Sequence, residues 1–329
     1  MVDRSATPEA GRGSDQTPRA LRLSVTDRCD LRCRYCLPAG RVPFLARWAL
    51  ASNADLFDAV GWLAASFGVD RVKLTGGEPL LRPGIGALVR GIAAIRGVRE
   101  VSMTSNGTRL ARLAQPLADA GLARVNVSLD TLEPERYAAL TRGGDLRRAL
   151  AGIEAARGAG LAVKLNAVLR RSAWRDDVPQ LLDFAAERGL EMRLIELMRT
   201  GTELAWVSEE HVAAAEVRRW LEGQGCLAPL PSPYAAPAER TALRWRGHEV
   251  ALGWITPVSH PFCAACDRLR LDARGRLRRC LMDPLAIPLL DLLRDRERAT
   301  AFARVAAYLG EKHAPLQMDS AAPMRAIGG

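Results

Sequence analysis

Three cysteines close to the N-terminus constrain the fold of this chain more than any other feature. Cys29, Cys33 and Cys36 are spaced C-x3-C-x2-C, and they follow an apolar run at 21–25 that has the composition of a buried strand. Thiolates are the usual protein ligands of iron–sulfur clusters, which normally take four ligands. Three thiolates would leave one iron of a four-iron cluster open to another molecule, whereas a structural zinc site is closed by four protein ligands. The loop after the first strand is therefore expected to form the wall of an open site.

A second group of cysteines lies near the C-terminus. Cys263, Cys266 and Cys280 have the spacing C-x2-C-x13-C. Taken alone, this group could be most of a zinc ribbon, with His260 as the fourth ligand. Beside the first motif, a second cluster held by three thiolates is the favoured interpretation. The seventh cysteine, Cys226, has no clustered partner and is predicted to be a small buried apolar residue.

Strand-like and helical patterns alternate along the first two thirds of the chain. Short apolar runs predict strands at 21–25, 72–75, 101–104, 125–129, 162–168 and 192–197. Helical spacing of apolar residues predicts helices at 53–67, 84–96, 109–120, 145–158 and 176–188. This alternation is typical of a parallel sheet with helices on its outer face. Such sheets carry their chemistry at the carboxyl ends of the strands, which is where the first cysteine loop lies.

The pattern changes in the last third of the chain. The elements expected there are a helix at 208–222, a surface linker at 226–240, one hairpin from 243–245 and 249–254, a second from 269–271 and 277–279, and a closing helix at 285–309. The second hairpin carries the distal cysteines. We therefore predict a disordered leader at 1–18, a barrel domain at 19–225 and a C-terminal domain at 226–329.

Composition excludes several classes of function. The net charge is +10, but the arginines are spread along the whole chain with few interleaved aromatic residues, which argues against a nucleic-acid-binding module. No apolar run is long enough to span a membrane, and the N-terminus lacks the apolar stretch of a signal peptide. Cysteines grouped as metal ligands indicate a reducing compartment. The chain is predicted to be cytoplasmic.

The motifs together resemble a known family. The first cysteine motif, with Tyr35 before its last cysteine, resembles the radical S-adenosylmethionine (SAM) superfamily. The segments Thr-Gly-Gly-Glu-Pro at 75–79 and Val-Ser-Leu-Asp at 127–130 align in order with it. The stretch 255–271 around the second cysteine group and the end of the chain at 323–329 look like the GTP 3′,8-cyclases, the first enzymes of molybdenum cofactor biosynthesis.

This resemblance covers roughly residues 18 to 329 and implies both a fold and a reaction. The fold class is α/β: a partial (β/α)6 TIM-like barrel of radical SAM type with a small C-terminal α+β domain that carries a second iron–sulfur cluster. The reaction converts GTP to (8S)-3′,8-cyclo-7,8-dihydroguanosine 5′-triphosphate via a 5′-deoxyadenosyl radical. The alternative is another two-cluster radical SAM enzyme that acts on a peptide or a different small molecule.

The resemblance also implies roles for individual residues. The two [4Fe-4S] clusters would be held by Cys29, Cys33, Cys36, Cys263, Cys266 and Cys280. The SAM contacts would be Tyr35, Gly77, Ser128 and Met198, although core packing explains Met198 equally well. The GTP contacts would be Arg22, Arg71, Lys73, Thr104, Lys164, Arg193, Arg268 and Arg270. The terminal residues Gly328 and Gly329 would enter the active site as an extended tail and take part in catalysis, in place of the fraying that is usual at a C-terminus.

The implied partners are small molecules and two proteins. They are GTP, SAM, an electron donor of flavodoxin or ferredoxin type, and the next enzyme of the pathway, cyclic pyranopterin monophosphate synthase. A triphosphate needs cations, and arginine and lysine side chains facing into a barrel can supply them. Any one of these cations taken alone would more often have a surface or ion-pair role. Five of them on four strands around one barrel argue against coincidence, and they are Arg22, Arg71, Lys73, Lys164 and Arg193.

Overall fold

A computed structural model describes residues 19–40, 43–200, 203–232, 237–295 and 297–312. The predicted leader at 1–18 and the tail residues Gly328 and Gly329 lie outside these described residues. Within the described ranges, no helix has the length and apolar character needed to cross a bilayer.

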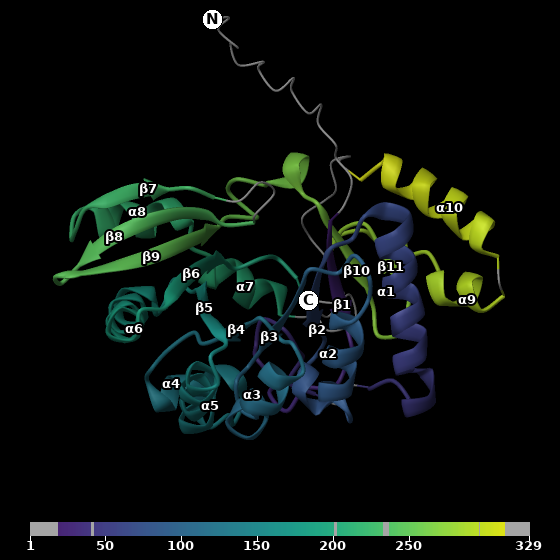
Figure 1. Ribbon diagram of the computed structural model, residues 1–329. Coiled ribbons are helices and arrows are strands. Elements are labelled where there is room, and N and C mark those ends of the chain that lie inside the picture. Colours follow the sequence, from purple (N-terminus) through teal and green to yellow (C-terminus); the bar gives the residue numbers. More distant parts are fainter. Residues whose placement is uncertain (1–18, 41–42, 201–202, 233–236, 296, 313–329) are drawn as a thin grey trace, which may run out of the picture.

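Six parallel strands form the centre of the molecule (Figure 1). They are β1 (Ala20–Ser24), β2 (Arg71–Thr75), β3 (Glu100–Ser105), β4 (Arg124–Ser128), β5 (Ala162–Leu169) and β6 (Glu191–Glu196). Each pairs in parallel with the next in chain order, which confirms the six predicted strands and their direction. Their apolar side chains are almost fully buried against the surrounding helices, as parallel sheets require.

Helices connect these strands and cover the outer face of the sheet (Figure 1). They are α1 (Asn53–Phe67), α2 (Ile85–Ala93), α3 (Leu110–Asp119), α4 (Pro134–Thr141), α5 (Leu146–Gly158) and α6 (Trp174–Arg188), with short 3-10 turns at Arg47–Ala49 and Pro79–Leu81. The five predicted helices are confirmed, and α4 is an additional one. Helix α1 shows why its bounds were predictable: Ser52 and Asp55 form a capping box at its start, and Gly68 ends it in the left-handed region with φ of 70°.

The C-terminal strands continue the same sheet at both of its edges. On one side, β9 (His248–Ile255) lies parallel to β6 and is followed by β8 (Glu239–Trp245) and β7 (Leu227–Leu230). On the other, β10 (Arg268–Leu271) lies parallel to β1 and pairs with β11 (Leu277–Arg278). The strand order is therefore β11-β10-β1-β2-β3-β4-β5-β6-β9-β8-β7. Both predicted hairpins are confirmed.

Three local predictions are wrong. The predicted linker at 226–240 contains strand β7, which tolerates Pro229 because an edge strand can lack one backbone donor. The helix predicted at 208–222 is two helices, α7 (Leu204–Glu210) and α8 (Ala214–Glu222), because His211 takes an extended conformation between them. Cys226 is exposed rather than buried.

The closing helix predicted at 285–309 is also divided. It consists of α9 (Leu289–Arg294) and α10 (Arg298–Gly310). Pro288 precedes α9, where its missing N–H costs nothing, and the chain leaves helical conformation at Asp295. Figure 1 shows α9 and α10 beside α1, and Phe302 of α10 stacks on Phe67 of α1 with ring centroids 5.2 Å apart.

Candidate active site

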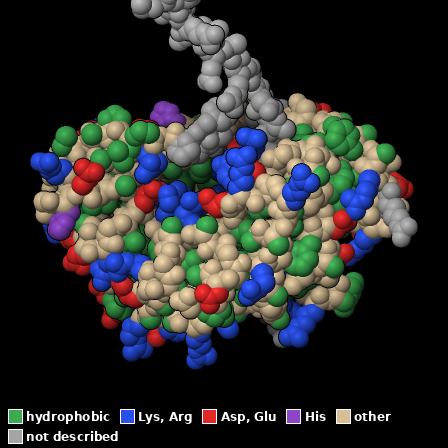
Figure 2. Space-filling model, viewed as in Figure 1, with side chains coloured by type: hydrophobic (Ala, Val, Ile, Leu, Met, Phe, Trp, Pro, Cys, Tyr) green, Lys and Arg blue, Asp and Glu red, His purple; other side chains and the backbone are tan. Residues whose placement is uncertain are grey.

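All six clustered cysteines line one cavity of about 380 Å³ at the carboxyl ends of the parallel strands. Residues at or just after the ends of strands β2, β3, β4 and β6 line it, together with residues of the segments 255–263 and 279–282. Figure 2 shows lysine and arginine side chains gathered at the centre of the face seen in Figure 1. The sequence placed the first cysteine loop at the strand ends, and the structure adds that the second cysteine group faces it across the same space.

The first cysteine group is held by backbone hydrogen bonds in a region with little access to water. The N–H of Cys36 donates to the carbonyl of Cys33 at 2.8 Å, and the N–H of Leu31 donates to the sulfur of Cys29 at 3.4 Å. Burial raises the pKa of Cys29 to about 12, with Glu78 and Asp30 adding to the effect. The pKa of Cys33 is also raised, first by burial and then by Cys36. Thiolates here need a positively charged partner, which a metal cluster provides.

Two glycines allow the backbone after β2 to pack against the cysteine loop. The N–H of Gly77 donates to the carbonyl of Thr26 at 2.8 Å, and the N–H of Glu78 donates to the carbonyl of Arg28 at 2.7 Å. A Cβ on Gly77 would lie 2.2 Å from that carbonyl oxygen of Arg28, and one on Gly76 would lie 2.4 Å from the carbonyl of Thr26. Because neither residue has a Cβ, the backbone after β2 can come close enough to form these hydrogen bonds, which hold the cysteine loop in place. The same lack of side chains would also let SAM approach this backbone.

Glu78 joins the cysteine loop to the end of β3. It is buried and accepts hydrogen bonds from the N–H of Leu80 at 3.1 Å, the N–H of Asn106 at 2.8 Å and the hydroxyl of Ser105 at 2.8 Å. Burial raises the pKa of Glu78 to about 7 in spite of these bonds. Asn106 in turn donates to Asp30 at 2.8 Å, so the loop is tied to two strand ends.

The four residues predicted to contact SAM all line the cavity. They are Tyr35, Gly77, Ser128 and Met198. The hydroxyl of Tyr35 donates to Asp130 at 2.7 Å, and the same carboxylate accepts the N–H of Val168 at 2.8 Å.

Three polar atoms on the cavity wall have no hydrogen-bond partner within the described part of the chain. They are the hydroxyl of Thr75 and the side-chain carbonyl oxygens of Asn126 and Asn166, all buried. A buried polar atom without a partner is costly, so these atoms indicate a polar ligand. The sequence analysis missed Asn126 and Asn166, although a single amide within an apolar strand is a signal that could have found them.

The second cysteine group lies among cations. Both Nε and Nη2 of Arg268 lie 3.4 Å from the sulfur of Cys266, and the ammonium of Lys312 lies 3.8 Å from it. Burial alone would raise the pKa of Cys266, but Arg268 and Lys312 outweigh it and lower this pKa. His260, the alternative zinc ligand, is exposed and does not line the cavity.

The cysteine sets fit clusters better than single ions. Within the described ranges, no three His, Cys, Asp or Glu side chains are placed to hold one metal ion. Each set consists of thiols alone, spread along the wall of one cavity, and in a cluster each thiolate binds a different iron.

Most of the predicted GTP contacts also line the cavity. They are Arg22, Lys73, Thr104, Arg193, Arg268 and Arg270. Arg22 lies between its register partners Arg270 on β10 and Lys73 on β2. Burial and then Arg270 lower the pKa of Arg22, while burial and then Arg22 lower the pKa of Lys73. This crowding of cations at the cavity wall indicates that the site is shaped for an anion.

Two predicted GTP contacts, Arg71 and Lys164, are not among the side chains that line the cavity. Arg71 forms ion pairs with Asp267 and, at 3.4 Å, with Asp70. Lys164 donates to Glu191 at 2.7 Å.

The same Glu191 carboxylate binds three cations. Besides Lys164, it accepts a hydrogen bond from Arg193 at 2.8 Å and pairs with Arg240 at 3.4 Å. Glu191 therefore neutralises part of the positive charge of Lys164 and Arg193.

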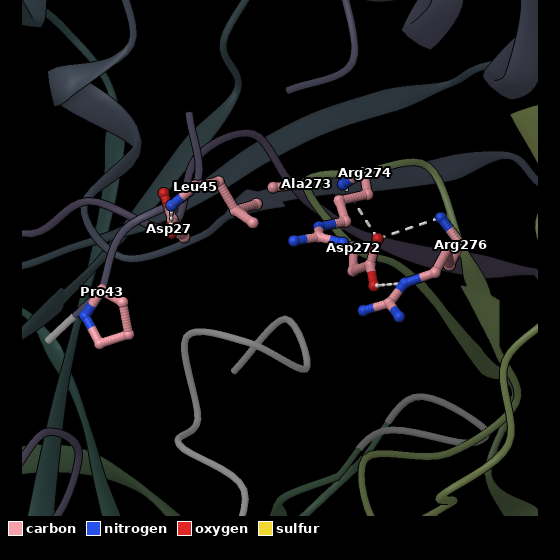
Figure 3. A pocket seen from close by; sticks show the side chains of 7 residues that line it. All are labelled: Asp27, Pro43, Leu45, Asp272, Ala273, Arg274 and Arg276. Atoms are coloured by element: carbon pink, nitrogen blue, oxygen red, sulfur yellow. Dashed lines mark hydrogen bonds and ion pairs between the residues drawn. The ribbon is translucent and has the colours of Figure 1, made fainter. Parts of the chain in front are cut away.

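A second cavity, of about 300 Å³, lies between the two cluster-bearing segments (Figure 3). On one side Asp27 accepts the N–H of Leu45 at 2.7 Å, and on the other Asp272 accepts Nε of Arg276 at 2.7 Å. These residues bind within their own segments, and the N–H of Ala51 donates to the carbonyl of Ala273 at 2.9 Å. The hydrogen bond between Ala51 and Ala273 holds the segment that follows the first cysteine loop beside the second hairpin.

Comparisons with known proteins agree with this geometry. The model of the radical SAM superfamily matches residues 23–185, and the model described as Molybdenum Cofactor Synthesis C matches residues 190–315. The fold is similar to the crystal structure of Streptococcus suis SuiB bound to S-adenosylmethionine, with a TM-score of 0.60 at 15% identity over 84% of this chain and 64% of that one. The chain is therefore a radical SAM protein, and the predicted fold class is confirmed.

Curated relatives define the family more narrowly. The chain is 45% identical over 275 residues to GTP 3′,8-cyclase 1 of Pseudomonas aeruginosa, which covers 83% of each sequence. It is 41% identical over 298 residues to the GTP 3′,8-cyclase of Moorella thermoacetica, which covers 89% of this chain and 91% of that one. The chain belongs to the GTP 3′,8-cyclase family, as its motifs predicted. Its cofactors are SAM and two [4Fe-4S] clusters.

Proposed function

We propose that this chain binds GTP in the cavity between its two cysteine groups and joins C3′ of the ribose to C8 of the purine there. The family reaction is the first step of molybdenum cofactor biosynthesis, and its product is (8S)-3′,8-cyclo-7,8-dihydroguanosine 5′-triphosphate. The observation that carries the proposal is a single cavity lined by six cysteines and a set of arginine and lysine side chains. Such a cavity can orient one substrate between two cofactor sites.

Cys29, Cys33 and Cys36, in the loop after β1, would hold the first cluster. Cys263, Cys266 and Cys280, around the second hairpin, would hold the second cluster. When bound, the first cluster with SAM supplies the one-electron chemistry that removes a hydrogen atom from the substrate, and the second cluster supplies an open iron for the guanine.

The chain's own residues bind and orient SAM. The hydrogen bond from Tyr35 to Asp130 fixes the ring of Tyr35 at the cavity wall, beside Ser128 and Met198. The carbonyl oxygens of Asn126 and Asn166 offer acceptors for the hydroxyl or amino groups of a nucleoside.

Cations that line the cavity favour GTP over the alternative peptide substrate. Arg22, Lys73 and Arg270 form a row across three neighbouring strands, and all three line the cavity. Arginine forks and a compact ammonium both suit phosphate oxygens, and charge-assisted bonds of this kind are the strong ones. Arg71 and Lys164 would reach the phosphates only by leaving their present ion-pair partners.

The remaining parts of the proposal concern the tail and the partners. Gly328 and Gly329 lie outside the described residues, and we expect them to enter the active site and assist cyclisation. The electron would come from a flavodoxin- or ferredoxin-like donor in the cytoplasm, and the product would pass to cyclic pyranopterin monophosphate synthase.

Anaerobic turnover tests this function directly. Reconstituted protein is incubated with SAM, GTP and dithionite, and the products are separated by chromatography and identified by mass spectrometry. We expect methionine, 5′-deoxyadenosine and the cyclic triphosphate in comparable amounts. The same reaction without GTP controls for uncoupled cleavage of SAM. Cleavage of SAM with no change to GTP would contradict the proposal and favour a different substrate.

Two truncations of equal length, one at each end of the chain, test the tail. Removal of Gly328 and Gly329 should abolish cyclisation, while the melting temperature and iron content stay unchanged. Removal of the first two residues of the chain serves as the control. Unchanged product formation after removal of the glycines would show that the tail has no catalytic role.

A further inference from the structure

Lys312 is a buried lysine for which the sequence offered no role. Only 6% of its surface is exposed. Its ammonium donates to the carbonyl of Arg268 at 2.7 Å and to the carbonyl of Arg279 at 2.7 Å, and it lies 3.8 Å from the sulfur of Cys266. An ammonium has three donors and no acceptor, so these three contacts use all of its hydrogen-bonding capacity.

The two carbonyl groups belong to the two sides of the second hairpin, and each side carries ligands of the second cluster. Arg268 follows Cys266 by two residues on β10, and Arg279 directly precedes Cys280 after β11. One ammonium therefore joins both sides of the second hairpin at the point where its cysteines enter the cavity.

Lys312 is the last residue of a short segment, residues 308–312, which we call the brace. Contacts of Tyr308 and Glu311 in this segment hold Lys312 in place. The hydroxyl of Tyr308 lies 2.8 Å from a carboxylate oxygen of Asp283, and Glu311 accepts a hydrogen bond from Arg279 at 2.8 Å. The guanidinium of Arg279 also lies 4.9 Å from the centre of the Tyr308 ring. These contacts fix the end of α10 against the loop that carries Cys280, so the position of the ammonium is set by its surroundings.

Burial of this ammonium needs a compensating negative charge. Within the described residues, neither Asp nor Glu forms a salt bridge with Lys312, and its third donor faces a cysteine. A cysteine that binds iron is a thiolate, and hydrogen bonds to cluster sulfurs are one of the means by which a protein sets a reduction potential. Arg268 contacts the same sulfur with two nitrogens, so Cys266 receives positive charge from two residues.

We propose that Lys312 is a positioning residue for the second cluster: it joins the two segments that carry the ligands and places a positive charge against Cys266. The inference rests on the second cluster assigned above. Removal of the charge is expected to lower the reduction potential of that cluster, because the reduced form carries one more negative charge. Removal of the bonds to the two carbonyls is expected to let iron leave faster.

The test uses the full chain with Cys29, Cys33 and Cys36 changed to serine, so that only the second cluster is present. Its potential is measured by an anaerobic redox titration followed by electron paramagnetic resonance, and iron loss is timed after addition of a chelator. An iron content of about four per chain confirms the cluster itself. If this triple serine variant held no iron, the assigned second cluster would be contradicted. The proposed role of Lys312 would then be overturned as well, because no cluster would be present for it to position.

Four variants separate charge from structure. Lys312→Met should lower the potential and speed iron loss roughly tenfold, which is the usual scale for loss of an outer-shell partner. Lys312→Arg keeps the charge and should restore most of the potential. Tyr308→Phe weakens the brace alone, so it should speed iron loss slightly with the potential unchanged. Arg304→Met removes an exposed charge from α10 and should change neither quantity.

Lys312→Gln replaces the methionine variant if that one does not fold, because the amide keeps two N–H donors and lacks the charge. A wild-type potential in either neutral variant would overturn the electrostatic role. An equal shift in Arg304→Met would show that net charge, and not the position of Lys312, is responsible.

Discussion

The two cysteine groups face the same cavity with the same number of thiols, yet carboxylates lie near Cys29 and Cys33, whereas cations lie near Cys266. The first is enclosed by backbone and by carboxylates such as Glu78 and Asp130, and the pKa of Cys29 rises to about 12 mainly through burial. The second is bordered by Arg268 and Lys312, which outweigh burial and lower the pKa of Cys266.

This difference matches two kinds of work. A cluster among neutral and acidic groups holds its electron weakly, which suits a site that must give an electron to SAM. A cluster among cations is more easily kept in its reduced form, which carries one more negative charge. The second cluster also lies beside the residues expected to bind a triphosphate. One cavity therefore combines an electron-donating wall with a substrate-binding wall.

Separate removal of each cysteine group should have the largest effect. Reconstituted wild-type protein is expected to hold about eight irons per chain, and each triple serine variant about four. Loss of Cys29, Cys33 and Cys36 should end all cleavage of SAM, because no electron can reach it. Loss of Cys263, Cys266 and Cys280 should end cyclisation and leave some uncoupled cleavage. Iron analysis and product chromatography measure both, and cyclic product from the second variant would remove the functional difference.

The thiols of the iron-free protein should differ in reactivity by a wide margin. Alkylation requires the thiolate, and a thiol with a pKa of about 12 is ionised in roughly one molecule in ten thousand at pH 8. Cys266, whose pKa is lowered, should react with iodoacetamide at least about a hundred times faster than Cys29. Mass spectrometry of timed, anaerobic digests gives both rates. Similar rates would show that the two surroundings do not differ in the way described.

The predicted GTP contacts that line the cavity should matter more for GTP than those that do not. Arg22→Ala should weaken GTP binding roughly ten- to a hundredfold, because a charge-assisted contact to phosphate is lost. Lys164→Ala should weaken it less, since Lys164 is already bound to Glu191. Isothermal titration of iron-loaded protein compares GTP with guanosine for each variant. An equal loss for both ligands would mean that these residues do not meet the phosphates.

Gly77→Ala should have the smallest effect and should be confined to the first wall. The new Cβ would meet the carbonyl of Arg28, and overpacking of this kind costs about 1–3 kcal/mol. We expect a lower melting temperature and faster iron loss from the first cluster alone. Gly86→Ala in α2 is the matched control, because its Cβ would meet nothing within 4 Å. A Gly77→Ala protein as stable as that control would show that the loop can move away.

The central sheet and the ligand cysteines could be predicted because each depends on local pattern. The strands are nearly continuous apolar runs, and Lys73 stands out in one of them. The position of the second hairpin could not be predicted, because strand order depends on pairing between distant residues, such as Leu21 with Leu269. Lys312 was missed for the same reason: nothing near it in the sequence shows that its partners lie at 266–279.

The pairing of β1 with β10 also governs how the chain can fold. One edge of β1 stays unpaired until a strand made about 250 residues later has left the ribosome. Contacts between such distant residues slow folding, and an unpaired edge can meanwhile bind another chain. This edge of β1 is thus covered only by a late part of the chain. A newly synthesised chain is therefore most prone to aggregate before β10 has paired with β1. Every pause in translation lengthens this interval.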